Sequence, residues 1–495
     1  MSFTSTFFLF LFFPLSVAGY YLIRSELRNL FLLIASIAFY AVGEPKLVLL
    51  LLISILVNYG FGLLIGKVRT VKVLGGLILF LSLAWNFGVL FYYKYLAFAV
   101  LNINQLFGSN LLIPEIALPL GISFFTFRTV SYCVEVYWQT CPAQKNLISL
   151  ALYISFFPQI TMGPITKYSV FESQLKNRQV SFDLFVEGVK KIIVGLAKKL
   201  ILANQLAVMV DAIFALQDGE RTVVAAWLGI IGYLLQLYYD FSGYSDMAIG
   251  MGNLFGFHTP ENFRYPYLSK EVAEYWGRWH ITLGTWLKDY LYTPVFRSVN
   301  GKQIPVLNKR VSIQYADYIA LLAVWTFAGI WHGAAWHYVF YGYYYCFFII
   351  VERIKDNYLK KRRKRLKLKK QPETRLQAAI SHVYFLIVLI FGQLLFRVSE
   401  ASDFFPYVGS MFGAVGNRLN DAFTMYQWGE SMVVFLIGIL FCFPIVKKVR
   451  QLAEKYVVAQ KIHDLFSPIL YIVLLVISLS FAITSTYQSF IYFQF

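Results

Sequence analysis

The feature of this sequence that most limits its possible folds is a series of apolar runs, each close to the length that crosses a lipid bilayer. A spanning helix needs about 20 mostly apolar residues, and such runs recur from Phe3 to Phe481 with short polar gaps. Hydrophobic residues make up 58% of the 495-residue chain and charged residues only 14%, whereas about a quarter of the residues of a soluble domain are charged. The pattern predicts that most of the chain is folded within a membrane.

The expected fold class is an all-α polytopic integral membrane protein with about 10–12 transmembrane helices plus re-entrant or interfacial helices. Gly121–Trp138 contains Arg128 and Glu135, which favours a re-entrant or interfacial segment over a clean span. The first run lacks the basic n-region of a signal peptide and is interpreted as an uncleaved span. The apolar runs lie near residues 3–23, 28–43, 46–65, 74–101, 148–165, 185–213, 222–250, 312–330, 335–352, 378–397, 431–446 and 466–486.

The basic residues give the expected orientation. The formal net charge is +18, but the Lys and Arg residues gather in short gaps between apolar runs, which is the positive-inside pattern and calls for no nucleic-acid partner. A basic face also attracts the anionic headgroups of the bilayer. The basic stretch Arg353–Lys370 is predicted to be cytoplasmic and the acidic loop 399–430 external. These assignments place both termini outside the cytoplasm, in a multi-pass protein of the cytoplasmic (inner) membrane.

No internal repeat is recognisable, so the chain is predicted to be one membrane domain over residues 1–495. Its expected parts are N-terminal helices at 1–117, a catalytic core at 118–352, a basic cytoplasmic loop at 353–371, and C-terminal helices with an external aromatic tail at 372–495.

A metal site is not supported by the sequence. His332 and His337 are five residues apart, roughly 140° around a helix, and no H-E-x-x-H spacing is present. The four cysteines are far apart in mostly apolar surroundings, which favours a packing role. No bound cofactor is therefore expected.

Carboxylates interrupt one of the apolar runs. Ionisable residues at membrane depth are costly, so they are candidates for function. Asp240 and Asp246 are six residues apart, about 120° around a helix, and are expected to meet different partners, whereas Ser242 and Asp246 share a face. The three residues are assigned either to a substrate passage or to helix pairing, in which the carboxylates neutralise Lys or Arg of neighbouring helices.

A second polar region is predicted to form one amphipathic interfacial helix, capped by Ser269 and stopped by Pro294. Trp279 and His280 fall on its apolar face, so the imidazole is expected to point inward, while Arg278 lies elsewhere around the helix. On the residues alone, His280 is either a packing residue or a functional one, and Arg278 and Trp279 are assigned to the passage or to helix pairing.

A third region places His332 in an apolar, aromatic segment beside Trp331, which is also assigned to the passage or to helix pairing. Gly329 and Gly333 leave room for a substrate or for another backbone to approach. Burial disfavours the imidazolium form, which would keep the ring neutral and able to act as a general base. Both catalysis and structural hydrogen bonding remain open for His332.

Five long motifs in fixed order resemble the membrane-bound O-acyltransferase family, most closely the branch that O-acetylates alginate and other exported polysaccharides. The resemblance extends from about residue 118 to the C-terminus. The motifs are LPLGISFFTFRTVSY (118–132), SFFPQITMGPITKY (155–168), YYDFSGYSDMAIGMGNLFGF (238–257), NFRYPYLS and RWHITLGTWLKDYLY (within 262–292) and GIWHGAAWHY (329–338).

The resemblance implies tilted helices around a central passage and specific roles for three residues. His332 matches the family's near-invariant histidine, and His280 matches its second histidine. The tail 489–495 is similar to the aromatic C-terminal motif of the polysaccharide-modifying branch, which suggests Tyr492 as a transient acyl carrier. The alternative for Tyr492 is a place in an aromatic belt that anchors the last helix at the interface.

The function that this resemblance implies is transfer of an acetyl group from cytoplasmic acetyl-CoA across the membrane for O-acetylation of an exported or cell-wall polysaccharide. An extracytoplasmic acetyltransferase partner would complete the transfer, so the protein would serve the polymer indirectly. A D-alanyl or lipid acyltransferase of the same family is the alternative enzyme. A polysaccharide or lipid-linked sugar transporter is the alternative from a different class.

Overall fold

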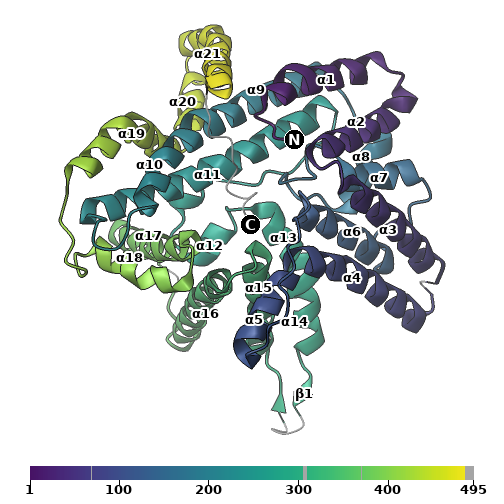
Figure 1. Ribbon diagram of the computed structural model, residues 1–495, viewed down its shortest axis with the longest axis horizontal. Coiled ribbons are helices and arrows are strands. Elements are labelled where there is room, and N and C mark those ends of the chain that lie inside the picture. Colours follow the sequence, from purple (N-terminus) through teal and green to yellow (C-terminus); the bar gives the residue numbers. More distant parts are fainter. Residues whose placement is uncertain (69, 305–308, 370, 485–495) are drawn as a thin grey trace. The chain divides into compact units, whose positions relative to one another are not determined.

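The computed structural model describes residues 1–68, 70–304, 309–369 and 371–484, and nearly all of its regular structure is helical (Figure 1). The exception in this part of the chain is a short antiparallel pair, β1 (Gln303–Ile304) and β2 (Lys309–Arg310), in which Gln303 faces Arg310. The all-α polytopic fold class is therefore confirmed.

Nine helices of the described residues are long and apolar enough to cross a membrane. The N-terminal run forms a shorter apolar helix, Phe8–Leu22, as does Leu96–Phe107. The expected total of about 10–12 spans stays a prediction, as does the division of one domain into four parts. The nine helices are Ser25–Gly43, Val48–Val68, Lys72–Lys94, Phe182–Phe214, Val223–Leu254, Ile313–His332, Arg375–Arg397, Ala422–Phe441 and Val457–Thr484.

Contacts group the residues into two compact units. The first contains Met1–Leu200, Phe241–Glu261 and the described residues 471–484, and the second contains Ile201–Asp240 and Asn262–Leu470. The helices of the first unit are α1 (Phe13–Leu22), α2 (Arg28–Gly43), α3 (Val48–Val68), α4 (Lys72–Lys94), α5 (Leu96–Phe107), α6 (Ile122–Tyr137), α7 (Leu147–Ser155), α8 (Tyr168–Asn177) and α9 (Phe182–Ala197), with the second half of α11 (Val223–Leu254).

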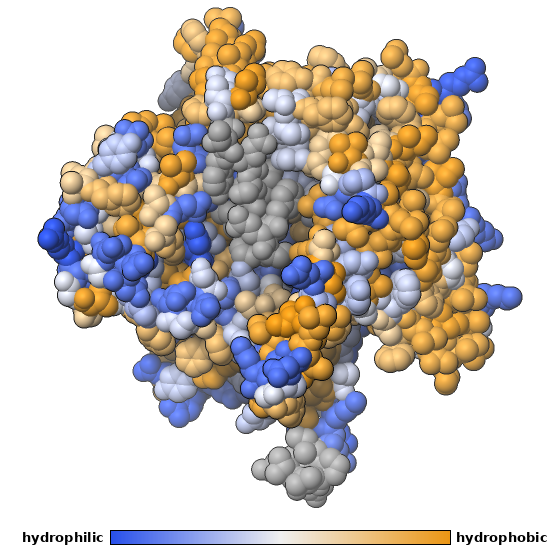
Figure 2. All heavy atoms as spheres, in the orientation of Figure 1, coloured by the Kyte–Doolittle hydropathy of each residue, from blue (hydrophilic) through white to orange (hydrophobic). Residues whose placement is uncertain are grey.

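Within the first unit, helix α6 is enclosed by its neighbours, whereas α3 and α4 carry many exposed apolar side chains (Figure 2). Arg128 of α6 is buried, donates to the Gln159 side chain at 2.7 Å and lies 4.4 Å from the centre of the Tyr153 ring. These contacts compensate in part for burying its charge. The expectation that Gly121–Trp138 is re-entrant or interfacial stays a prediction.

The second unit contains the remaining helices. They are α10 (Asn204–Phe214), the first half of α11, α12 (Val272–Trp276), α13 (Ile281–Leu287), α14 (Thr293–Val299), α15 (Ile313–His332), α16 (Trp336–Arg365), α17 (Arg375–Arg397), α18 (Phe404–Met411), α19 (Ala422–Phe441), α20 (Ile445–Ala453) and α21 (Val457–Thr484), the last only as far as Leu470. Three residues join α15 to α16, and the two helices pack along one another.

The predicted single helix from Ser269 to Pro294 is wrong. The segment is divided into α12, α13 and a π-helical turn at Lys288–Tyr292, which leads into α14. The Ser269 hydroxyl donates to the Pro266 carbonyl at 2.7 Å instead of capping α12. Pro294 lies in the first turn of α14 and does not end the helical stretch, which continues to Val299. The break between α12 and α13 falls at His280, which has a left-handed φ of 45°.

Candidate active site

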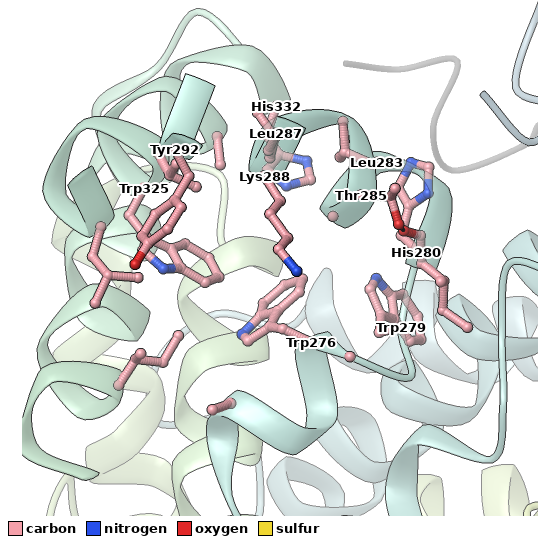
Figure 3. A pocket seen from close by; sticks show the side chains of 18 of the residues that line it. Trp276, Trp279, His280, Leu283, Thr285, Leu287, Lys288, Tyr292, Trp325 and His332 are labelled. Carbon is pink, nitrogen blue, oxygen red and sulfur yellow. Dashed lines mark hydrogen bonds between the residues drawn. The ribbon is translucent and has the colours of Figure 1, made fainter. Parts of the chain in front are cut away.

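A cavity of about 530 Å³ lies within the second unit, between the α12–α14 segment and helices α15 and α16 (Figure 3). Its size falls in the range of small-molecule and cofactor sites, about 300–1,000 Å³. His280 and His332, 52 positions apart in the sequence, both line it. The two histidines that the sequence singled out therefore share one cavity.

One stripe of α15 forms a wall of the cavity. The lining residues Leu321, Trp325, Ala328 and His332 are separated by three or four positions, which places their side chains on one helical face. Ala328 and Trp325 are mostly buried, and His332 is only 6% exposed at the last position of the helix. The regular helix thus carries the imidazole to one end of the cavity.

Aromatic rings surround the His332 imidazole. The ring centres of Trp331 and Phe396 lie 5.0 Å from it, and that of Tyr341 lies 5.5 Å away. Phe396 and Tyr341 meet the imidazole nearly edge to face, at 90° and 88°, which is a favourable aromatic geometry. These contacts restrict the orientation of the His332 ring.

The glycines near His332 answer a question that the sequence left open. A Cβ atom on Gly329 would lie 2.6 Å from the Tyr338 carbonyl oxygen, and one on Gly333 would lie 2.3 Å from the Tyr338 ring. A Cβ on Gly342 would lie 2.4 Å from the Trp325 carbonyl oxygen. The missing side chains therefore make room for the neighbouring part of the α15–α16 pair, and not for a substrate.

His280 is 3% exposed and is fixed by an asparagine from the loop before α12. Its Nδ1 lies 3.1 Å from Oδ1 of Asn262, and the Asn262 carbonyl oxygen accepts a bond of 2.9 Å from the Ile281 backbone N–H. Burial lowers the pKa of the His280 imidazole to about 3, so the ring is neutral near pH 7. The Trp331 ring, which adjoins His332, has its centre 6.2 Å from that of His280.

Two basic side chains also line the cavity. Lys288 comes from the π-helical turn, and its side chain extends into the cavity in Figure 3. Arg353 of α16 forms an ion pair with Asp317 of α15, and the same carboxylate accepts a hydrogen bond from the Tyr292 hydroxyl. The cavity lining thus contains two imidazoles, of His280 and His332, and two basic side chains, of Lys288 and Arg353.

The structure brings some of the other predicted site residues to this cavity and leaves others outside it. Trp279 lines it, and Trp331 contacts both histidine rings. Arg278 is not among the lining residues and pairs with Glu274 at 2.6 Å. Tyr492 and the rest of the aromatic tail lie outside the described residues.

The polar residues of α11 do not line this cavity. Asp240 and Ser242 are each 2% exposed. Asp246 accepts a bond of 2.6 Å from Lys198, just after α9, as the helix-pairing alternative expects of a carboxylate at membrane depth. Whether any of these residues contributes to a passage stays a prediction.

The sequence did not single out Asn262, Lys288 or Arg353 as site residues. Asn262 begins the motif NFRYPYLS and Lys288 lies with His280 in RWHITLGTWLKDYLY, but no spacing within these motifs indicated a role for either residue, and Arg353 lies outside them. Arg353 lies 65 positions after Lys288. Only the tertiary packing of α16 against α15 and the segment after α12 brings Lys288 and Arg353 to one cavity, whereas Asn262 contacts His280 from outside its lining.

The sequence that forms this cavity is similar to a known protein family. Residues 141–398, which include both histidines, match the model of MBOAT, the membrane-bound O-acyltransferase family. A probable alginate O-acetylase of Pseudomonas aeruginosa is 40% identical over 359 residues, covering 71% of this chain and 66% of that protein. The chain belongs to the membrane-bound O-acyltransferase family. The predictions of this family and of a membrane-bound acyltransferase are thereby confirmed.

Two further relatives of this membrane-bound O-acyltransferase are named for different activities. A peptidoglycan O-acetyltransferase of Helicobacter pylori is 32% identical over 372 residues, covering 69% of this chain and 68% of the relative. A teichoic acid D-alanyltransferase of Bacillus subtilis is 32% identical over 233 residues, covering 46% of this chain and 56% of the relative. The family membership supports a multi-pass membrane enzyme, and not the transporter alternative.

Proposed function

We propose that this enzyme takes an acetyl group from cytoplasmic acetyl-CoA and passes it across the membrane for O-acetylation of an exported or cell-wall polysaccharide. The observation that carries the proposal is the placement of His332 and His280 in one cavity that also contains Lys288 and Arg353. The names of two relatives, an alginate O-acetylase and a peptidoglycan O-acetyltransferase, agree with an acetyl group and a polysaccharide acceptor.

The distribution of charge favours donor entry from the cytoplasm. Arg353 belongs to α16, whose last turn contains Arg362, Arg363, Lys364 and Arg365, and basic segments are retained on the cytoplasmic side. Asp317, the partner of Arg353, precedes His332 by 15 positions on α15, about 22 Å along the axis. Phosphates of the donor would lie near the basic end, with its acyl group toward His332.

The proposed reaction is an acyl transfer with His332 as general base. Nε2 or Nδ1 of the neutral imidazole accepts the proton of an acceptor hydroxyl while its oxygen bonds to the thioester carbon. The C–S bond then breaks, and the departing thiolate of coenzyme A takes the proton from the imidazolium. In this proposal acetyl-CoA is a substrate and not a bound cofactor.

The destination of the acetyl group is part of the same proposal. Tyr492 would carry it transiently at the external face, and a separate extracytoplasmic acetyltransferase would move it to the polymer. This arrangement requires a protein of the cytoplasmic (inner) membrane with both termini outside the cytoplasm. Intact-protein mass analysis after incubation with labelled acetyl-CoA tests the carrier, because label retained in Tyr492→Phe excludes it.

The experiment that tests the proposed function compares two histidine variants. His332→Ala is expected to abolish acetyl ester in the exported polymer, whereas His463→Ala should not, because the His463 side chain is 37% exposed in α21 and is remote in sequence from the cavity-lining residues. Both variants must be recovered folded from the membrane in similar amounts. Normal esterification with His332→Ala would exclude His332 as the base.

A second candidate is D-alanyl transfer, because one relative is named a teichoic acid D-alanyltransferase. The two enzymes would differ in donor, and purified protein can be offered acetyl-CoA or a D-alanyl carrier protein in competition. Transfer of D-alanine from the charged carrier protein, without release of coenzyme A from acetyl-CoA, would favour the D-alanyl alternative.

A further inference from the structure

The side chain of Asn262 makes three contacts through one atom. Its Oδ1 lies 3.1 Å from the Thr282 backbone nitrogen, 2.9 Å from the Thr282 hydroxyl and 3.1 Å from Nδ1 of His280. Asn262 is 1% exposed, so these are the contacts of a buried group. A buried amide with several partners holds its own position and theirs.

The chemistry of these contacts determines the tautomer of His280. A backbone N–H can only donate, so the atom that receives the Thr282 N–H is the carbonyl oxygen of the amide and not its nitrogen. A carbonyl oxygen can only accept, so Nδ1 of His280 must donate a proton to it. A neutral imidazole carries one N–H, and therefore Nε2 of His280 carries the lone pair.

The backbone around His280 is held by the same segment. His280 has φ +45°, a left-handed conformation that is strained for a residue with a side chain. The backbone carbonyl of Asn262 accepts a hydrogen bond from the Ile281 N–H at 2.9 Å, and the backbone N–H of Arg264 donates to the Arg278 carbonyl at 2.9 Å. A strained backbone conformation persists where several surrounding contacts hold it in place. Here these contacts lie on both sides of His280.

We propose that Asn262 is a positioning residue, which holds His280 as the Nδ1–H tautomer so that Nε2 is the hydrogen-bond acceptor of this ring in the reaction. The role rests on the proposed acyl transfer in the cavity that His280 lines. His280 would accept a hydrogen bond from the acceptor hydroxyl or from a water on it, and would so orient that hydroxyl for His332. A His280 that donated through Nε2 could not do this.

The charged groups near His280 leave its ring neutral in the wild type. Arg264 and Arg278 flank it through the backbone, and the Arg278 guanidinium pairs with Glu274. Lys288 and Arg353 are the basic groups among the cavity-lining residues, and Arg353 pairs with Asp317. Within the described residues that line the cavity there is no carboxylate. Asn262→Asp would therefore add a negative charge next to His280 that the lining residues do not supply.

The test compares Asn262→Asp with Thr282→Val. Aspartate has the shape of asparagine and still accepts all three bonds, and acceptance of several hydrogen bonds keeps a carboxylate ionised. Its charge is expected to raise the pKa of His280 and to move the acidic limb of the kcat/KM profile upward by about 1–3 pH units. Thr282→Val removes one donor to the same oxygen and adds no charge, so its acidic limb should remain in place.

A second measurement is independent of activity. Nitrogen-15 shifts of labelled histidine, assigned through His280→Gln, should report an Nδ1-protonated ring in the wild type and in Thr282→Val. An Nε2-protonated ring in the wild type, or an unmoved acidic limb in folded Asn262→Asp, would overturn the proposal. Loss of activity in Asn262→Asp at every pH, with the wild-type tautomer, would also contradict it, because aspartate preserves every contact of a positioning residue. The histidine tautomer is measurable even if His332→Ala refutes the proposed reaction, so the two failures are distinguishable.

Discussion

The close approach of α15 and α16 predicts that a substitution at Gly342, which does not line the cavity, will lower the rate of catalysis. Gly342→Ala would place a Cβ atom 2.4 Å from the carbonyl oxygen of Trp325 and 3.1 Å from Cα of Gly329. Both obstacles are helical backbone atoms, which cannot rotate away as a flexible side chain does. The variant must therefore separate the two helices or strain them.

The size of the displacement follows from these distances. Ordinary contact begins at 3.4 Å, so the helices must move apart by about 1 Å where Gly342 meets Trp325. His332 lies seven positions after Trp325 on the same helix, and a misplacement of about 1 Å can cost about 100-fold in rate. We expect kcat to fall by about 100-fold, equivalent to about 2.7 kcal/mol of transition-state stabilisation, with about 1–3 kcal/mol lost from the free energy of unfolding.

The assay is coenzyme A release from acetyl-CoA by purified protein, with thermal unfolding measured on the same sample. Gly88→Ala is the matched control, because no atom lies within 4 Å of the added Cβ, and it should change neither quantity by much. A Gly342→Ala protein with the activity and thermal midpoint of the wild type would show that α15 and α16 are not held at this separation.

Three further predictions concern other parts of the molecule. Lys288→Gln should raise the KM for acetyl-CoA about tenfold, with a smaller change in kcat, because a charge-assisted contact between Lys288 and a donor phosphate would contribute about 1.5 kcal/mol or more. An unchanged KM in steady-state kinetics would place the donor phosphates elsewhere. Asp246→Asn removes the carboxylate partner of Lys198. Both side chains are a little over a fifth exposed, so the expected loss in the free energy of unfolding is about 1–3 kcal/mol, below that for a fully buried pair. An unchanged thermal midpoint would contradict this. Gly195→Ala brings a Cβ to 2.6 Å from the Gly243 carbonyl oxygen and should lower the thermal midpoint, whereas Gly60→Ala, in open space, should not.

Hydrophobic patterning was sufficient to predict the fold class, because burial in lipid requires long apolar helices whatever their packing. One of the two alternatives that it left for the carboxylates was pairing with a basic residue, and Asp246 does pair with Lys198. Hydrophobic patterning could not identify Lys198 as the partner. The cost of an unpaired charge can be judged from the apolar residues around it in the sequence, whereas the identity of its partner depends on how the helices pack.

The break at His280 shows where local reasoning failed. The helical spacing of aromatic residues continues through Trp279, so the pattern alone favours one helix. Asn262 accepts hydrogen bonds from this segment and the Arg264 N–H donates one to it; both residues lie outside the pattern, and their bonds stabilise a left-handed residue in its middle. The shared cavity could likewise not be predicted from periodicity, because Lys288, His332 and Arg353 meet only through packing.

The length of helix α16 has a consequence for how acetyl-CoA, the proposed donor, would reach the cavity. Its 30 residues span about 45 Å, whereas the hydrocarbon core of a bilayer is about 30 Å thick. The helix is therefore long enough to project beyond the lipid as a rigid rod that begins beside His332 and carries its cationic last turns into the aqueous phase. Such a rod concentrates polyanions over a distance of about one Debye length, about 8 Å at physiological ionic strength. Encounter with the donor, measured as kcat/KM, should weaken as salt is added, while the rate at saturating donor should not.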